Sequence, residues 1–212
     1  RGDAMMPKAA IVDPELTRSC PPAITAQAGM DALTQAIESF CSRHATNFTD
    51  ALAVKAIDLV YRHLVQAFRH GEDLAARAAV AEGSMLAGLA LANARLGAVH
   101  GLAHPVGGTC HLPHGLVCAI LLPAVLAFNR PVLEREPGGK YGELARLLGG
   151  DPEQKTRNLL AQLELPCDFT SFRIDPALLA TFAEQAMVSG STKANPRDVT
   201  PEDVETILRP LL

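Results

Sequence analysis

The chain has 212 residues, enough for one large domain or two small ones with a substantial buried core. Its formal net charge of −4 and its scattered Lys and Arg residues argue against a nucleic-acid-binding surface, which needs concentrated positive charge. No run of about eighteen uncharged apolar residues occurs, so we expect no membrane span.

The composition indicates an all-α protein. Hydrophobic residues form 48% of the chain but aromatic residues only 4%, and Ala and Leu dominate the apolar set, which suits closely packed helices. The five cysteines are widely spaced and odd in number, as is typical of reduced thiols rather than a disulfide framework. Reduced thiols lead us to expect a cytoplasmic location, and the first residues contain no signal-peptide-like hydrophobic region.

The N-terminal stretch "KAAIVD" (8–13) is the one segment with a strand pattern, and Pro14 ends it. A lone strand cannot satisfy its own backbone hydrogen bonds, and the chain offers no clear partner strand. We therefore expect residues 1–21 to be a residual strand and linker that belong to an α/β domain missing from this chain. Residues 22–212 are expected to form a single helical domain.

Helical periodicity begins near Pro22 and continues to the end of the sequence. Small residues in the third predicted helix favour close approach of neighbours, so that helix is expected to be central and buried. The fourth is apolar nearly all round and is also expected to be buried. The last begins at Thr200, with Pro201 at a favourable first position. The predicted helices cover 23–42, 49–68, 73–97, 115–129, 140–150, 152–165, 176–187 and 200–212.

Four of the seven histidines lie in "GAVHGLAHPVGGTCHLPHG" (97–115), namely His100, His104, His111 and His114. His100 and His104 are four residues apart and would share one helix face. Gly107 and Gly108 then allow the chain to turn, after which His114 opens the apolar helix and could point back at the first pair. Converging imidazoles beside buried helices suggest a transition-metal site.

The helix "GMDALTQAIE" supplies oxygen ligands for such a site. Asp31, His100 and His114 would give three protein ligands, and Gln35, one turn after Asp31, a weak neutral fourth, leaving room for a substrate oxygen. The alternatives are ordinary: Asp31 and Gln35 can be a solvated helix face, and paired histidines can be structural. The Cys110–His111 pair is expected to be a chance imitation of a metal motif.

Several long segments, in order, resemble the helical C-terminal part of the iron-containing (group III) alcohol dehydrogenases. They are "AAIVDPELTRSCPP", "AGMDALTQAIESF", "GAVHGLAHPVGGTCHLPHGLVCAILLP" and "GSTKANPRDVTPEDV". The resemblance covers almost the whole chain and implies the dehydroquinate synthase-like fold of that family.

The resemblance also implies roles for residues. Asp31, His100 and His114 match metal-ligand positions, and Gln35 stands at a ligand position that is usually histidine. His104 matches a histidine near the nicotinamide end of the site, with a catalytic role in proton relay or cofactor contact. The implied activity is oxidoreduction of a small alcohol, aldehyde or ketone, with Fe²⁺ or Zn²⁺ and NAD(P) as cofactors.

The family implies partners as well: a homodimer, and an N-terminal α/β domain with a glycine-rich phosphate loop that binds most of the dinucleotide. We find no such loop here, so the chain as given is expected to be inactive alone. No nucleic acid or membrane partner is expected. The alternative function is a non-catalytic helical interaction module, which the Gln35 substitution and the absent nucleotide domain would favour.

Overall fold

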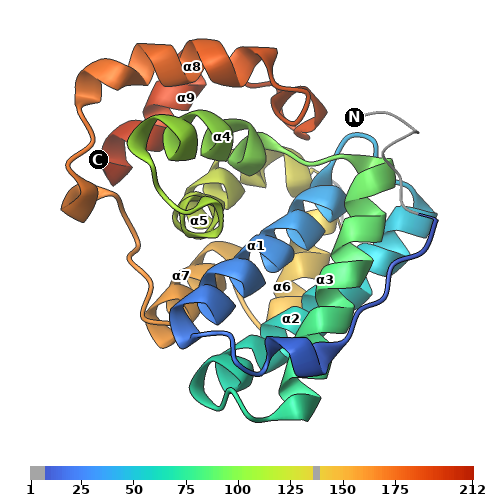
Figure 1. Cartoon of the computed structure of the whole chain (residues 1–212). Coiled ribbons are helices and arrows are strands. Elements are labelled where there is room, and N and C mark those ends of the chain that lie inside the picture. Colours follow the sequence, from blue (N-terminus) through green and yellow to red (C-terminus); the bar gives the residue numbers. More distant parts are fainter. Residues whose placement is uncertain (1–7, 136–138) are drawn as a thin grey trace.

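The computed structural model describes residues 8–135 and 139–212, and its regular structure in those ranges is helical (Figure 1). The α-helices are α1 (Pro22–Cys41), α2 (Asn47–Arg69), α3 (Leu74–Ala94), α4 (Ala98–Cys110), α5 (His114–Leu133), α6 (Lys140–Leu148), α7 (Pro152–Gln162), α8 (Leu179–Val188) and α9 (Pro201–Leu208). Short 3-10 turns cover Pro14–Thr17, Thr170–Phe172, Pro176–Leu178, Thr192–Ala194 and Arg209–Leu211. The predicted all-α class is confirmed.

Local sequence signals explain where many helices begin. Thr46 and Thr49 form a capping box at the start of α2, and Asp73 and Asp151 cap α3 and α7 through their side chains. Thr200 caps α9 with Pro201 in its first turn, as the sequence predicts. These caps satisfy backbone N–H groups that have no partner inside the helix.

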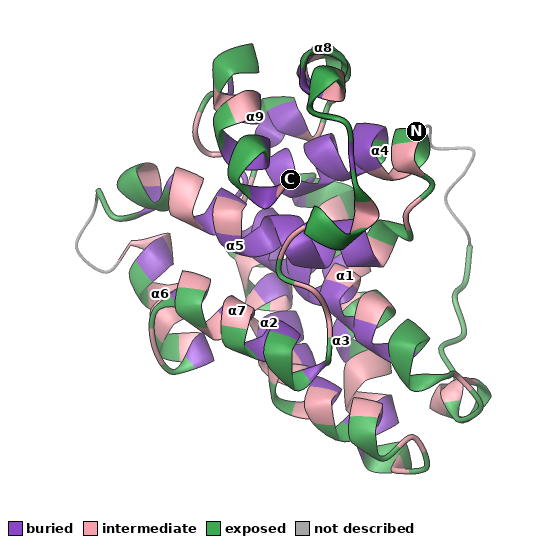
Figure 2. Ribbon diagram, turned by 90° about the vertical axis from the view of Figure 1, so that its left-hand side faces the viewer, coloured by how far each residue is buried: buried purple, intermediate pink, exposed green. Residues whose placement is uncertain are grey.

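α5 lies near the middle of the helical fold (Figure 1). α1, α2 and α3 pack against one another, and α5 contacts α1, α4 and α7. α8 packs against both α4 and α9. Figure 2 shows buried residues concentrated on α5 and α4. The prediction that the apolar segment 115–129 lies in the core is confirmed, since most residues of α5 are buried.

One sequence prediction about these elements is wrong, and another is not tested. Residues 8–13 adopt no regular structure in this chain, and their expected pairing with strands of a domain outside these 212 residues stays a prediction. α3 is not central: its small residues pack against α1 and α2, but Met85 and Leu89 on its outer face are 39% and 47% exposed. Small residues allow other helices to pack closely on any face of a helix, but they do not require every face to be covered.

The N-terminal residues 8–17 run beside that outer face of α3. Ile11 and Leu16 are 95% and 80% exposed, and Ala10, Val12, Met85 and Leu89 line one apolar groove. The division of the chain at residue 21 stays a prediction, and its first seven residues lie outside the described part. By length and composition alone, α3 and α5 could cross a membrane, but α5 is mostly buried inside this fold, as core helices of soluble proteins are.

Candidate metal centre

Three helices bring four metal-ligand side chains to one point. Asp31 lies in the middle of α1, His100 in the first turn of α4, and His114 and Cys118 in the first two turns of α5. One ligand atom from each lies within 4.8 Å of the other three. The structure therefore brings together Asp31, His100 and His114, as predicted from the sequence, and adds Cys118.

The distances within the cluster suit a single cation. His100 Nε2 and His114 Nε2 lie 3.1 and 3.7 Å from Asp31 Oδ1, and Cys118 Sγ lies 3.5 Å from His114 Nε2. Ligands at ordinary zinc distances occupy tetrahedron corners about 3.3–3.8 Å apart. The side chains thus stand close to the spacing of bound ligands, and the donor set of oxygen, nitrogen and sulfur fits a divalent transition metal.

Glu38 orients His100 from behind. Its Oε2 lies 2.7 Å from His100 Nδ1, and because a carboxylate only accepts, Nδ1 carries a proton and Nε2 is the nitrogen that faces the cluster. Glu38 is buried and also accepts hydrogen bonds from the backbone N–H groups of Val99 and His100. A carboxylate behind a histidine is the usual support of a metal-ligating imidazole.

The loop "ANPR" (194–197) fixes the N-terminus of α4. Asn195 is fully buried, and its Oδ1 accepts from Ala98 N and Asn129 Nδ2 at 3.1 and 3.0 Å. Its Nδ2 donates to Asn129 Oδ1 and to the Arg197 carbonyl, both at 2.7 Å. Asn195 therefore ties α4 to α5, which are the two helices that carry the histidines.

Gly97 allows this arrangement at the start of α4. A Cβ atom there would stand 2.7 Å from Glu38 Oε1 and 3.0 Å from Asn195 Oδ1, too close for either acceptor to keep its place. Both acceptors would then have to move away from the first N–H groups of the helix, Glu38 Oε1 further than Asn195 Oδ1. The glycine before His100 is thus required by close approach, since its φ of −140° is open to any residue.

Burial and charge shift the ionisation of the cluster. Burial works to lower the pKa of His100, but its hydrogen bonds with Asp31, Cys118 and Glu38 raise that pKa to about 12. Burial works to raise the pKa of Asp31, yet the hydrogen bond and charge of His100 and the charge of His114 leave it lowered. Burial lowers the pKa of His114 and raises that of the Cys118 thiol to about 11. Asp31 is therefore held as a carboxylate that can bind a cation.

Gln35 lies beside the cluster, as predicted, but its amide group faces Asp31. Gln35 Nε2 donates to Asp31 Oδ2 at 3.1 Å, so the NH₂ group holds the carboxylate oxygen that the histidines do not contact. An amide binds metals through its oxygen, not its NH₂ group. In this orientation Gln35 supports Asp31 without being a ligand itself.

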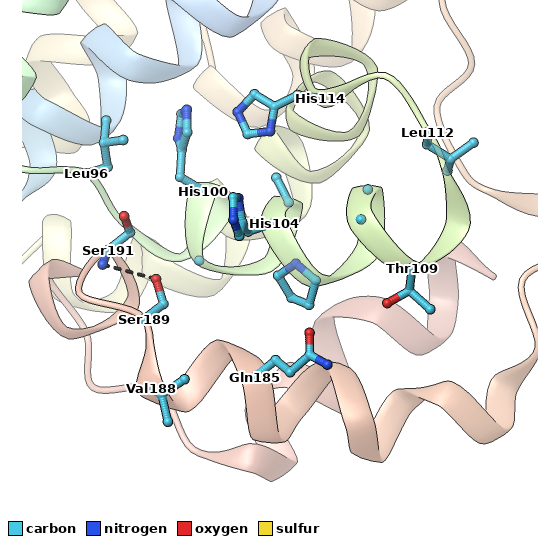
Figure 3. A pocket seen from close by; sticks show the side chains of 15 residues that line it. Leu96, His100, His104, Thr109, Leu112, His114, Gln185, Val188, Ser189 and Ser191 are labelled. Atoms are coloured by element: carbon cyan, nitrogen blue, oxygen red, sulfur yellow. Dashed lines mark hydrogen bonds between the residues drawn. The ribbon is translucent and has the colours of Figure 1, made fainter. Parts of the chain in front are cut away.

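An open cavity of about 1090 Å³ lies over the histidines (Figure 3). His100, His104 and His114 line it, and Gln185, Ser189 and Ser191 face them from α8 and the loop that follows it. His104 lies one turn after His100 on α4 and is exposed to the cavity. The structure thus places His104 on the cavity wall, and its implied position near the nicotinamide end of the site and its role stay predictions.

The turn that Gly107 and Gly108 allow comes a few residues later in the chain. α4 continues through both glycines to Cys110 and ends at His111, whose φ of 54° is left-handed and whose N–H bonds to the Gly107 carbonyl. Neither Cys110 nor His111 belongs to the cluster, as expected.

Sequence reasoning missed Cys118 and Glu38. Cys118 follows His114 by four residues, and Glu38 follows Asp31 by seven, so both share a helix face with a predicted ligand. Helical spacing could have found both residues.

Comparison with known proteins gives a consistent result. Residues 25–212 match the profile of the Fe-containing alcohol dehydrogenase family, C-terminal. The 1-propanol dehydrogenase PduQ of Salmonella typhimurium is 37% identical over 99% of this chain and 60% of its own length. The 1,3-propanediol dehydrogenase of Klebsiella pneumoniae is 37% identical over 96% of this chain and 55% of its own.

Solved structures share the fold. A 1,3-propanediol oxidoreductase superposes with a TM-score of 0.88 at 35% identity, covering 94% of this chain and 55% of that one. The sulfoacetaldehyde reductase of Bifidobacterium kashiwanohense, solved with NAD⁺, gives 0.89 at 29% identity, covering 99% and 55%. The chain belongs to the iron-containing alcohol dehydrogenase family and matches its C-terminal helical domain. It spans little more than half the length of these relatives.

Proposed function

We propose that this chain is the metal- and substrate-binding part of an NAD(P)-dependent alcohol dehydrogenase that oxidises small alcohols or reduces the matching aldehydes or ketones. The observation that carries the proposal is the cluster of Asp31, His100, His114 and Cys118 at the base of an open cavity. Family membership and the names of the alcohol dehydrogenases that resemble the chain support the reaction class.

A divalent cation in this cluster would supply Lewis-acid polarisation of an alcohol or carbonyl oxygen. Asp31, His100 and His114 would hold it, and Glu38 would keep His100 in the binding tautomer. Exposed His104, on the same face as His100, would carry a proton between the substrate hydroxyl and water. Ser189, Ser191 and Gln185 offer hydrogen bonds to a small polar substrate on the opposite wall.

The dinucleotide partner is proposed from the relatives rather than from side chains of this chain. A structural relative was solved with NAD⁺, and relatives are nearly twice as long as this chain. We propose that an N-terminal α/β domain outside these 212 residues binds most of the nucleotide, and that the functional unit is a cytoplasmic homodimer. On this view the helical domain alone binds metal but does not turn over alcohol.

Metal retention tests the proposal directly. The chain, purified without chelators and loaded with Fe²⁺ or Zn²⁺, should hold about one metal ion by elemental analysis, as four converging ligands require. Asp31→Ala and His114→Ala should lose it, whereas His44→Ala, which changes an exposed histidine after α1, should not. Equal metal content in all four proteins would refute the assigned site.

Turnover tests the reaction class. A protein that joins this chain to its dinucleotide-binding domain should reduce NAD⁺ or NADP⁺ with 1-propanol or 1,3-propanediol, and His104→Ala should lower kcat by about 10²- to 10⁴-fold, the usual size of a general acid–base contribution. A metal-loaded protein that oxidises no alcohol would favour the non-catalytic module instead.

A further inference from the structure

We propose that the Cys118 thiolate is a metal ligand in this chain and that the site is built for zinc rather than iron. The inference rests on the proposed metal function and concerns which side chains complete the site. Three observations carry it: where the sulfur lies, which way Gln35 faces, and which side of the cluster opens to the cavity.

The Cys118 sulfur lies among polar ligand atoms and not in an apolar pocket. Cys118 is fully buried one turn after His114, and its Sγ is within 4.8 Å of ligand atoms of Asp31, His100 and His114. Buried cysteines usually act as small hydrophobic residues, as Cys41 on α1 can, which belongs to no such cluster within the described residues. The surroundings of Cys118 are those of a ligand.

Gln35 cannot provide the fourth ligand in its present orientation. Its NH₂ group donates to Asp31 Oδ2, which leaves Oδ1 directed at the two histidines. A neutral amide oxygen is also a poorer ligand for zinc than a thiolate. Gln35 is therefore a positioning residue for Asp31, and Cys118 takes the fourth corner.

The ligand set has the charge and softness that zinc favours. Asp31 and the Cys118 thiolate contribute two negative charges, which balance a divalent cation held also by two neutral imidazoles. On binding, the Cys118 thiol and Nε2 of the His100 imidazolium each give up a proton to solvent, and the sulfur–zinc and nitrogen–zinc bonds form with no change of oxidation state. A thiolate shifts the preference from iron towards zinc.

Four protein ligands still leave a position for substrate. His100 and His114 line the open cavity, whereas Asp31 and Cys118 do not. Cys118, which is fully buried, would therefore bind a cation from the protein interior. A fifth position on the cavity side would stay available, and zinc sites accept five ligands during catalysis.

X-ray absorption of the zinc-loaded chain tests this without any mutation. One zinc–sulfur distance of about 2.3 Å beside nitrogen and oxygen distances of about 2.0–2.1 Å is expected. The cobalt-loaded chain should also show a near-ultraviolet sulfur-to-cobalt charge-transfer band. Bound zinc with nitrogen and oxygen ligands only would overturn the inference and leave the proposed metal site standing. No bound metal would overturn both.

Variants assign the sulfur. Cys118→Ser should remove the zinc–sulfur distance and the cobalt band. It should also weaken zinc binding by about 100-fold, because losing a ligand should cost at least as much affinity as losing a residue that only supports a ligand. Cys110→Ser, at the far end of α4, should change none of these three, and Gln35→Ala should keep the sulfur distance. Retention of the sulfur distance in Cys118→Ser would overturn the assignment.

Discussion

Replacing Glu38 by glutamine tests whether the buried carboxylate sets the tautomer of His100. Glu38 accepts hydrogen bonds from Val99 N at 2.6 Å, His100 N at 3.4 Å and His100 Nδ1 at 2.7 Å. The glutamine side chain would keep one acceptor oxygen, which can still serve Val99 N. Its NH₂ group would face Nδ1, so the imidazole proton would move to Nε2, the nitrogen aimed at Asp31 and the cation.

The expected result is a large loss of metal affinity with a smaller loss of stability. Zinc affinity should fall by about 10- to 100-fold, the usual effect of removing the partner behind a metal-bound histidine. The free energy of unfolding should fall by about 1–3 kcal/mol, because charge-assisted hydrogen bonds become neutral ones. In addition, the backbone N–H of His100 would face the NH₂ group of the glutamine, which is a donor, in place of the Oε2 acceptor. Competition with a zinc indicator gives the affinity, and urea unfolding of the metal-free chain gives the stability.

Glu82→Gln is the matched control, because it makes the same chemical change at an exposed position on α3. It should leave zinc affinity and unfolding unchanged. Equal zinc affinities in the Glu38→Gln and Glu82→Gln variants would refute the reasoning, since they would show that His100 binds the cation without help from the carboxylate.

Two further predictions concern packing and ionisation. Gly115→Ala should lower the free energy of unfolding by about 1–3 kcal/mol, because its Cβ would lie 2.3 Å from the Gln27 carbonyl oxygen. The control Gly88→Ala, whose Cβ would meet no atom within 4 Å, should raise the free energy of unfolding by about 0.4–1 kcal/mol. Equal urea midpoints for the two variants would contradict the close contact at Gly115. Burial, the hydrogen bond to Asp151 and that residue's charge raise the pKa of Tyr141 to about 12, so Asp151→Asn should lower it in an absorbance titration, and an unchanged curve would contradict the assigned cause. Because the folded-state pKa lies above the usual value of about 10, this contribution to stability is present below pH 10 and is lost as the pH rises towards 12.

The helical class and the placing of most helices could be predicted from the sequence because their causes are local. Apolar residues recur at helical spacing, and Thr46, Asp73, Asp151 and Thr200 mark helix starts through hydrogen bonds only a few residues long. The exact end of α4 could not be predicted, because no local signal sets it. Gly107 and Gly108 permit a turn but do not impose one, and the helix runs on to its end at His111.

In the candidate metal centre, too, some features could be predicted from the sequence and others could not. Helical spacing and the histidine motif indicated Asp31, His100 and His114, and the sequence alone determined that these residue types could bind a metal. Only the tertiary structure decided which atoms meet. The α1–α4 contact places Glu38 behind His100, the α1–α5 contact brings Cys118 to the cluster, and the Gln35 amide faces Asp31 with its donors.

The physical reason is the range of each interaction. A helix forms through bonds between residues four apart, so the sequence around it is enough to predict it. The metal centre depends on the angles and spacings at which three helices pack, and those depend on contacts between distant segments. Asn195, nearly one hundred residues after His100, caps the helix that carries this histidine and shows how far along the chain such a contact can reach.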